Sequence, residues 1–240
     1  AFREFVGLDN FMSLPQDRFM RIAAMNTFRF VLAMTTVEIG IAFFLAVAIF
    51  QAYFRGAAWL RGIIFFPCVL SAVVVGIVWR NIVFLRGGFI HQITTTLSLP
   101  DFYPLSKPDV AFYMIILVGM WQSIGFNLVI FYAGLQSVDN EVLESAQIDG
   151  ANYWQLMLRV IAPILWPVFV VNIVLNVIGG VNVFDLAQTM GGPGWGVMKT
   201  SHYGDALATY MYFNSFGGSV AGGYRKFGYA ASIAVVMMLV

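Results

Sequence analysis

Long apolar stretches separated by short polar segments dominate the chain. Because a helix needs roughly twenty mostly apolar residues to cross a bilayer, each such stretch predicts one membrane-spanning helix. The pattern therefore predicts an all-α integral membrane protein, a polytopic helical bundle in which residues 1–240 form a single transmembrane domain. The expected spans cover about residues 25–50, 62–83, 110–136, 158–184 and 226–240.

The composition supports this prediction. Hydrophobic residues make up 60% of the chain, charged residues 10%, and the mean hydropathy is +0.81, whereas about a quarter of the residues of a soluble domain are charged. The net charge of +1 gives no electrostatic reason to expect a nucleic-acid partner. Cys68 is the single cysteine, so no disulfide can form within the chain, and a small packing residue is the expected role.

A polar segment over residues 137–159 interrupts the apolar pattern near the middle of the chain. Small and apolar residues recur there at steps of three or four, which predicts a surface helix from Asp139 to Leu158. Asp139 or Asn140 can cap its start. An amphipathic segment lying on a membrane has the same periodicity, so periodicity alone leaves the role of the segment open. The recurring residues are Leu143, Ala146, Gly150, Trp154 and Met157.

Basic residues in short loops predict the orientation, because cytoplasmic loops are enriched in Lys and Arg. The loop 51–61 contains Arg55 and Arg61 and no acid, so we expect it in the cytoplasm. Counting spans then places 137–159 in the cytoplasm and 86–109 and 185–225 outside. The amino-terminal stretch also falls outside, which predicts one further span before Ala1, and the last span is truncated at Val240.

The residues of the central segment are more specific than its periodicity. The strings from Phe131 to Ser137 and from Glu144 to Ala151, followed by Pro163, closely resemble the "EAA" loop of ABC-importer permeases of the maltose-type carbohydrate family. Ser145 stands where the family usually has Ala, and Ala162 where it usually has Leu, but the spacing of the motif is kept. The resemblance covers nearly the whole chain, since further family features follow in the expected order: Asn26-Thr27, Arg61, Pro67, Trp79, Gly88, Phe184-Asp185, Gly191-Gly192-Pro193 and the string from Phe227 to Ala231.

The resemblance implies a type I importer fold of about six spans, because similar permeases have a first span directly before a string like Phe5–Phe11. It implies a location in the prokaryotic inner membrane and partners: a second, homologous permease subunit, two ATP-binding cassette subunits, an extracytoplasmic solute-binding protein and a sugar. ATP and Mg²⁺ would bind the partner subunits, and this chain would hold no cofactor. The residues implied to couple it to the ATPases are Glu144, Ser145, Ala146, Asp149 and Gly150.

No motif predicts catalysis by this chain. The sequence has no Gly-x-x-x-x-Gly-Lys-Ser/Thr string, so we do not expect it to bind ATP phosphates. His91 and His202 have no carboxylate or cysteine at metal-ligand spacing, and Asp185 and Asp205 form no recognisable catalytic pair. The sequence therefore predicts a transport subunit without catalytic or metal-binding residues.

Polar residues inside the expected spans are candidates for the substrate path, because such residues usually face a bundle interior or a pathway. Glu38 is mid-span, and Ser123 and Asn172 are further polar positions. Hydrogen bonding between helices would explain them equally well. Amides also suit sugar hydroxyls, Phe184 could stack on a sugar ring, and in similar permeases the helix after the central loop lines the sugar site. The candidate path residues are Gln122, Asn127, Asn176, Gly180, Asn182 and Phe184.

Other functions remain open at this stage. Permeases for amino acids, polyols or metals carry similar loops, and the strings 131–137 and 184–193 are what favour sugar. An intramembrane enzyme would need converging reactive groups, and the spans contain amides with a single acid, Glu38. A channel would need no coupling loop. The sequence specifies neither the sugar nor whether the second permease is another copy of this chain.

Overall fold

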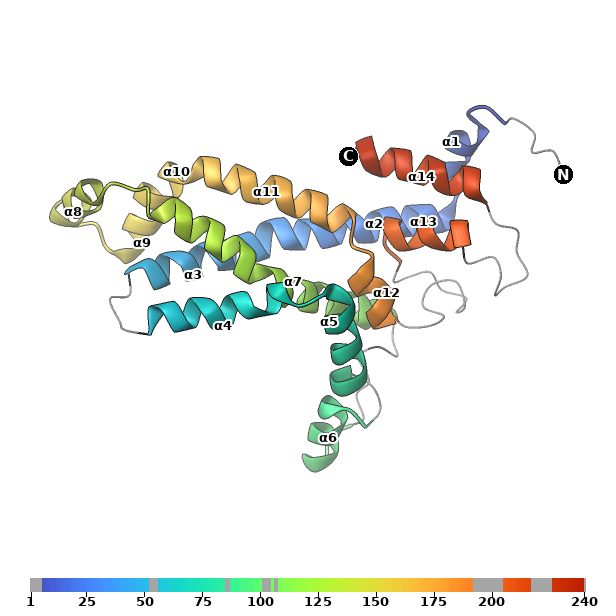
Figure 1. The fold of residues 1–240 in the computed structure, drawn as a ribbon, viewed down its shortest axis with the longest axis horizontal. Helices are drawn as coiled ribbons and strands as arrows, with labels where there is room; N and C mark the ends of the chain where they lie inside the picture. The colour runs from blue at the N-terminus through green and yellow to red at the C-terminus, as the bar shows by residue number, and fades with distance from the viewer. Residues whose placement is uncertain are drawn as a thin grey trace. The chain divides into compact units, whose positions relative to one another are not determined.

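The structure is a computed structural model that describes residues 6–51, 56–84, 87–100, 105, 108–191, 205–216 and 226–239. Every regular element in these ranges is a helix (Figure 1), so the predicted all-α membrane fold is confirmed. Three helices are long and apolar enough to cross a membrane: Arg18–Gln51, Ala72–Thr96 and Val110–Leu135. Arg55, His202 and Gly192-Pro193-Gly194 lie outside the described residues.

Three further apolar regions among the described residues are bent or short. Helices Tyr153–Ile164 and Trp166–Val181 meet at a bend of 74° and together could form a fourth span, and Ala58–Val69 and Phe227–Leu239 are shorter apolar helices. The bend lies where Pro163 and Pro167 are one turn apart. Because Pro167 has no N–H, it cannot bond to the carbonyl of Pro163 and continue a regular helix.

Most α-helices are joined by short connections, and three are extended by π-helical turns over Met34–Glu38, Trp79–Phe84 and Leu156–Ile161. The α-helices are α1 (Asp9–Ser13), α2 (Arg18–Ala33), α3 (Ile39–Gln51), α4 (Ala57–Val69), α5 (Ala72–Val78), α6 (Phe89–Thr96), α7 (Pro108–Leu135), α8 (Asn140–Ile148), α9 (Tyr153–Gln155), α10 (Ala162–Ile164), α11 (Trp166–Val181), α12 (Asp185–Gly191), α13 (Leu207–Phe216) and α14 (Phe227–Leu239).

The chain divides into two compact units, each assembled from separate stretches of sequence. Unit 1 contains residues 1–31, 72–118 and 179–240, and unit 2 contains residues 32–71 and 119–178. Since helices α7 and α11 each contribute to both units, neither unit corresponds to a continuous piece of the chain.

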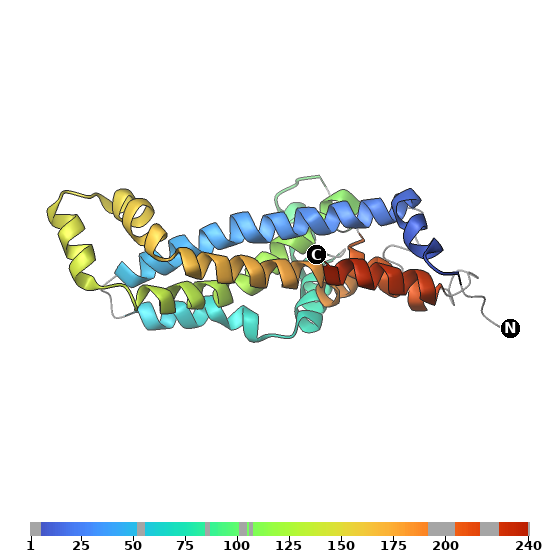
Figure 2. The same cartoon turned by 90° about the horizontal axis from the view of Figure 1, so that it is seen from above.

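The core of unit 2 lies between α3, α7 and α11, which run side by side in both views (Figures 1 and 2). Phe43, Phe131 and Phe169, one from each helix, form a ring cluster with centroid distances of 4.7–5.5 Å. Edge and tilted contacts of this kind add to the burial of apolar area. These three helices therefore pack around one shared aromatic core.

Helix α4 packs on α7 in the same unit and ends before the expected span does. A side chain at Gly125 would overlap the backbone of Ile64 and Phe65, so the glycine allows the two helices to approach closely. The helix stops at Val69, and the Leu70 carbonyl, left without a helical partner, accepts a hydrogen bond from Gln122 Nε2 at 2.9 Å. The stretch 62–83 thus contains a helix break that hydropathy did not predict.

The core of unit 1 joins α2 to α13 and α14 through Met20, Leu207 and Ile233. Asn26 donates a hydrogen bond to the Asp205 carbonyl at 3.1 Å, and the Leu207 N–H donates to Thr27 Oγ1 at 2.9 Å. The sequence predicted an external loop over 185–225, but the described part of it contains α12 and α13. Both are too short to span a bilayer, so span length could not reveal them.

Candidate functional site

The polar central segment starts with helix α8, and Asp139 is its N-cap. The Asp139 side chain accepts a hydrogen bond from the Glu141 N–H at 3.1 Å. This bond satisfies one of the N–H groups that the first turn of a helix leaves without a partner. Asp139 is one of the two caps that the sequence predicted.

The helix ends much earlier than its periodicity predicted. It stops at Ile148, where the Ala151 N–H bonds to the Ala146 carbonyl and the Gly150 N–H bonds to the Gln147 carbonyl, both at 3.0 Å. This pair of bonds is the Schellman motif, which requires a left-handed residue, and Gly150 has φ +84°. The prediction of a single helix to Leu158 was therefore wrong, because Gly150 is a stop signal within the periodic pattern.

A second start signal follows the turn directly. The Asn152 side chain accepts from the Gln155 N–H, and the Gln155 side chain accepts from the Asn152 N–H, both at 2.9 Å. This reciprocal capping box begins helix α9. The central segment is therefore a helix, a tight turn and a second helix that leads into α11.

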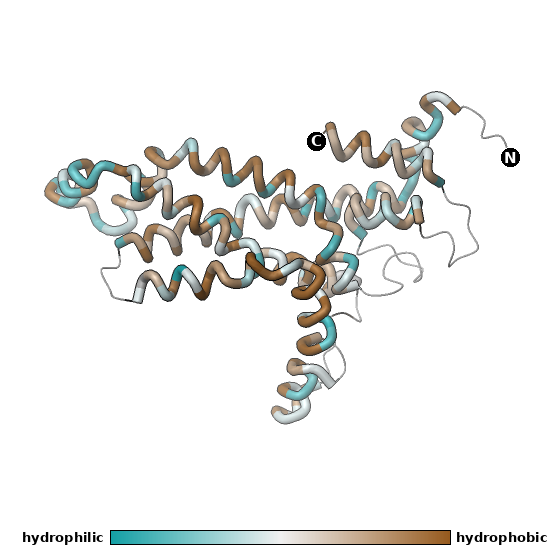
Figure 3. The backbone as a smooth tube through the Cα atoms, viewed as in Figure 1, coloured by the Kyte–Doolittle hydropathy of each residue, from teal (hydrophilic) through white to brown (hydrophobic). Residues whose placement is uncertain are grey.

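Helix α8 has one face packed on the core of unit 2, to which it belongs, and one face exposed. Leu143 is buried and Ala146 is partly buried against the unit 2 core, whereas Glu144 and Ser145 are exposed. Figure 3 shows hydrophilic positions along this helix, in contrast to the mainly hydrophobic α11. At the end of the helix, Ile148 is 86% exposed.

Asp149 and Gly150, the other predicted coupling residues, form the turn that follows, and both are exposed. A Cβ atom added at Gly150 would have no neighbour within 4 Å. A side chain there would therefore point into open space beside the described residues.

A polar cluster lies inside unit 2, among the three helices that share its aromatic core. Glu38 is fully buried, and Asn127 and Asn176 are 1% and 9% exposed. Asn127 Nδ2 donates to Glu38 Oε1 at 2.5 Å and to Asn176 Oδ1 at 3.4 Å. The three residues come from the π-helical turn before α3, from α7 and from α11. The cluster thus ties together the same helices as the aromatic rings.

The other candidate path residues of the sequence do not join this cluster. Gln122 donates its hydrogen bond to the Leu70 carbonyl, at the break after α4. In unit 1, Gly180 lies so close to Val31 that an added Cβ would be 2.7 Å from its side chain, and the Phe184 ring packs on Tyr212 at 4.9 Å. Asn182 is exposed just after α11 ends. Of the predicted path residues in unit 2, Asn127 and Asn176 lie together, and Gln122 bonds elsewhere.

The sequence identified Glu38 as a mid-span polar residue, open to packing or to the path, but the final set of path residues did not include it. Its bond to Asn127 depends on packing between helices distant in the chain. No described group of three His, Cys, Asp or Glu residues could hold a metal ion. His91 instead accepts a hydrogen bond from the Gly87 N–H at 3.3 Å.

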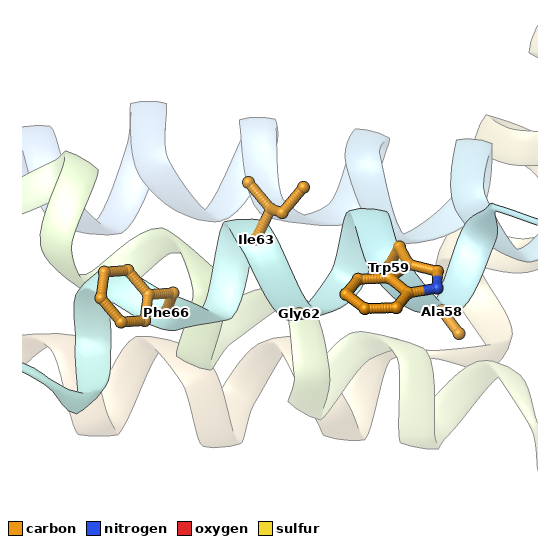
Figure 4. Close-up of a pocket in the computed structure, with 5 residues that line it drawn as sticks. All are labelled: Ala58, Trp59, Gly62, Ile63 and Phe66. Atoms are coloured by element: carbon orange, nitrogen blue, oxygen red, sulfur yellow. The ribbon is translucent and has the colours of Figure 1, made fainter.

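A shallow pocket on α4 offers no comparable chemistry. It is lined by Ala58, Trp59, Gly62, Ile63 and Phe66, with the Trp59 side chain 80% exposed (Figure 4). The lining is almost entirely apolar and cannot satisfy a sugar hydroxyl. This surface suits lipid chains or an apolar helix and is not a candidate substrate path.

Comparison with known proteins identifies the family. The family described as "Binding-protein-dependent transport system inner membrane component" matches residues 38–240, which include the central segment and the buried cluster. The chain belongs to this family. It is therefore a permease subunit of an ABC importer in the inner membrane, a transport component and not an enzyme, as the sequence predicted.

Relatives with named functions cover nearly the whole chain. The osmoprotective compounds uptake permease of Synechocystis sp. is 28% identical over 99% of this chain and 82% of its own length. The arabinooligosaccharides transport system permease of Bacillus subtilis is 27% identical over 98% of this chain and 72% of its own. The trehalose/maltose transport system permease of Thermococcus litoralis is 27% identical over 88% and 70%.

A solved structure has the same fold. The crystal structure of a bacterial alginate ABC transporter in complex with an alginate pentasaccharide-bound periplasmic protein contains a chain with a TM-score of 0.81 to this permease. The two chains are 24% identical, and the match covers 98% of this chain and 80% of the other. This likeness supports the importer fold.

Proposed function

We propose that this permease carries a carbohydrate across the membrane, driven by ATP hydrolysis in two cassette subunits that dock on α8 and its turn. The substrate would be delivered by an extracytoplasmic solute-binding protein, and a second, homologous permease would complete the path. ATP and Mg²⁺ would bind the cassette subunits. Movement of those subunits would rock the spans between inward and outward access.

The exposed surface of α8 is the observation that carries the coupling part of this proposal. Glu144 offers acceptor oxygens, Ile148 offers apolar area, and Gly150 keeps the turn compact. On the other face, Leu143 packs into the core between α3, α7 and α11. A force applied to α8 would therefore reach the spans through a packed contact and not through a loose loop.

The buried amides and the names of the relatives support the carbohydrate assignment. Asn127 and Asn176 provide donors and acceptors within the bundle, and the relatives named above are described for arabinooligosaccharides and for trehalose and maltose. A small osmoprotective solute is a second candidate, because the relative from Synechocystis sp. is described for such compounds.

Purification of the intact complex tests the assembly and the substrate class. We expect the cassette ATPase and a second permease to copurify in mild detergent. After reconstitution with the binding protein, ATP-driven uptake of trehalose, maltotriose or arabinotriose is the expected result. Uptake of a small osmolyte without any sugar would favour the second candidate, and purification without an ATPase would contradict the coupling proposal.

Matched variants of Gly150 separate backbone conformation from bulk. Asn adopts the left-handed conformation more readily than other residues with a side chain, and a β-branched residue does so poorly. Gly150→Val should therefore abolish uptake in an assembled complex, whereas Gly150→Asn should retain a large part of it. Gly150→Arg should also uncouple, because its side chain would occupy the docking space. Normal uptake by Gly150→Val would show that the turn does not contribute to coupling.

A further inference from the structure

The three buried polar residues of unit 2 leave polar atoms unused. Glu38 Oε2, Asn127 Oδ1 and Asn176 Nδ2 are buried and have no hydrogen-bond partner among the described residues. Leaving such an atom without a partner costs about 1–3 kcal/mol, and most buried polar atoms in proteins are paired. Elsewhere in the described ranges, unpaired buried atoms also occur singly, at Gln51, Asn172 and Gln188, whereas three of them gather in this one bonded cluster.

The direction of the hydrogen bonds explains how the cluster is ordered. The carboxyl oxygen of Glu38 accepts, so Asn127 turns its NH₂ group toward it. The same NH₂ group donates to Asn176 Oδ1. An amide has its donor and its acceptor on opposite branches, so fixing one end of each amide also fixes the other. Asn127 Oδ1 and Asn176 Nδ2 are then left as an acceptor and a donor without described partners, on two side chains that are bonded to each other.

An acceptor and a donor on two bonded amides match a hydroxyl group, which can donate one hydrogen bond and accept another. The structure assigns to Glu38 a positioning role: we propose that its carboxyl group, acting through Asn127, orients the two amides to bind a hydroxyl of the transported carbohydrate. This inference rests on the proposed carbohydrate substrate and adds a residue that touches the substrate path only through another residue.

Asn172 shows that burial of an amide alone does not produce this arrangement. It lies on α11 one turn before Asn176 and is fully buried. Its Nδ2 donates to the Val168 carbonyl of its own helix at 2.9 Å and not to Glu38 or Asn127. Asn172 is therefore the matched control for every variant of the cluster.

Transport by the reconstituted complex tests the positioning role. The probe is the best-transported sugar among trehalose, maltotriose and arabinotriose, presented on the binding protein. Glu38→Met removes the acceptor and should raise the half-saturating probe concentration about tenfold. Glu38→Gln keeps an acceptor oxygen at the same place and should restore most of the affinity. If Glu38→Gln is as impaired as Glu38→Met, the negative charge matters and not the acceptor, which would overturn the proposal.

A double variant tests whether Glu38 acts through the amides. If it does, Glu38→Met combined with Asn176→Ala should be no worse than the more impaired single variant, because both remove the same interaction. Losses that multiply to about a hundredfold would show two independent effects and overturn the relay. Glu38→Met combined with Asn172→Ala should show independent effects.

A measurement without substrate distinguishes failure of this inference from failure of the carbohydrate proposal. In the assembled complex in detergent, the melting-temperature shifts of Glu38→Met and Asn127→Ala should be non-additive, and those of Glu38→Met and Asn172→Ala should be additive. Additive shifts for the first pair would contradict the relay, whatever the substrate. A wild-type complex that assembles but transports none of the three sugars would instead contradict the proposed substrate class.

Discussion

Asp17 and Glu38 are two acidic residues that each join three helices, but they differ in how completely their oxygens are bonded. Asp17 stands before α2 in unit 1 and binds side chains of α13 and α14. Glu38 stands before α3 in unit 2 and reaches α7 and, through Asn127, α11. The comparison separates a carboxyl group that serves the fold from one whose arrangement suits binding.

The bonds of Asp17 are complete. Its Oδ1 accepts from the N–H groups of Phe19 at 2.8 Å and Met20 at 3.4 Å, which caps α2. Its Oδ2 accepts from the hydroxyl groups of Tyr210 and Tyr229, each at 2.6 Å. Charge-assisted bonds of this kind are stronger than neutral ones. Asp17 therefore fixes the start of α2 against α13 and α14 and leaves nothing for a ligand.

The bonds of Glu38 are incomplete, although it is the more deeply buried of the two. One oxygen accepts from Asn127 and the Ser123 hydroxyl also lies close to the carboxyl group, but Oε2 makes no hydrogen bond in the described part of the chain. Unsatisfied polar groups lower stability, and proteins retain them mainly where function requires them. The two acids therefore differ in the completeness of their hydrogen bonding more than their burial alone would suggest, and we assign a binding role only to the incompletely bonded one.

Removing the Asp17 carboxyl group should produce the largest loss of stability. Asp17→Ala removes a helix cap, worth about 1 kcal/mol, and two hydrogen bonds to a charged group, and should lower the free energy of unfolding by about 3 kcal/mol. Chemical unfolding of the purified protein measures this loss. Tyr229→Phe removes a single donor and should cost about 1 kcal/mol. Equal stability of Asp17→Ala and wild type would show that the Asp17 carboxyl group does not hold the fold together.

The pH dependence of stability should give a smaller effect with a defined sign. Burial raises the pKa of Asp17. The hydrogen bonds from Tyr210, Tyr229 and the two N–H groups together lower it by more than burial raises it, so the net pKa lies below its ordinary value of 3.8. A carboxyl group with a lowered pKa stabilises the fold above the unfolded-state pKa and loses this contribution as the pH falls through the folded-state pKa.

The stability difference between wild type and Asp17→Asn should therefore be constant near neutral pH and shrink below about pH 4, near the unfolded-state pKa. Unfolding measured from pH 7 to pH 3 tests this expectation. A difference that grows on acidification would contradict the assigned direction of the shift.

Glu38→Met should have the smallest effect on stability. The substitution leaves Asn127 Nδ2 without one partner but also removes a buried carboxyl group that is only half bonded. These effects oppose each other, so the free energy of unfolding should change by no more than about 1 kcal/mol, while uptake falls. A loss as large as that of Asp17→Ala, with uptake reduced only in proportion to folded protein, would place Glu38 with the structural acids.

Local patterns in the sequence determined the helices, the membrane class and the turn signals. Apolar stretches of sufficient length predicted the long helices that end at Gln51 and Leu135, and Asp139 was a predicted cap. The order of motifs predicted the importer family. Spans, caps and turns depend on residues within a few positions of one another, so a single sequence specifies them. Where local signals competed, as at Gly150, periodicity alone gave the wrong helix length.

Only the tertiary structure decided which polar groups meet. Asp17 is 193 residues from Tyr210 and 212 from Tyr229, and Glu38 is 89 residues from Asn127. The sequence predicted Gln122 and Asn127 as equivalent path residues. In the structure, Gln122 donates to the Leu70 carbonyl where α4 ends, whereas Asn127 joins the buried cluster. A helical period states which residues share a face, but the partner of that face depends on the packing of helices distant in the chain, where small residues such as Gly125 allow close approach.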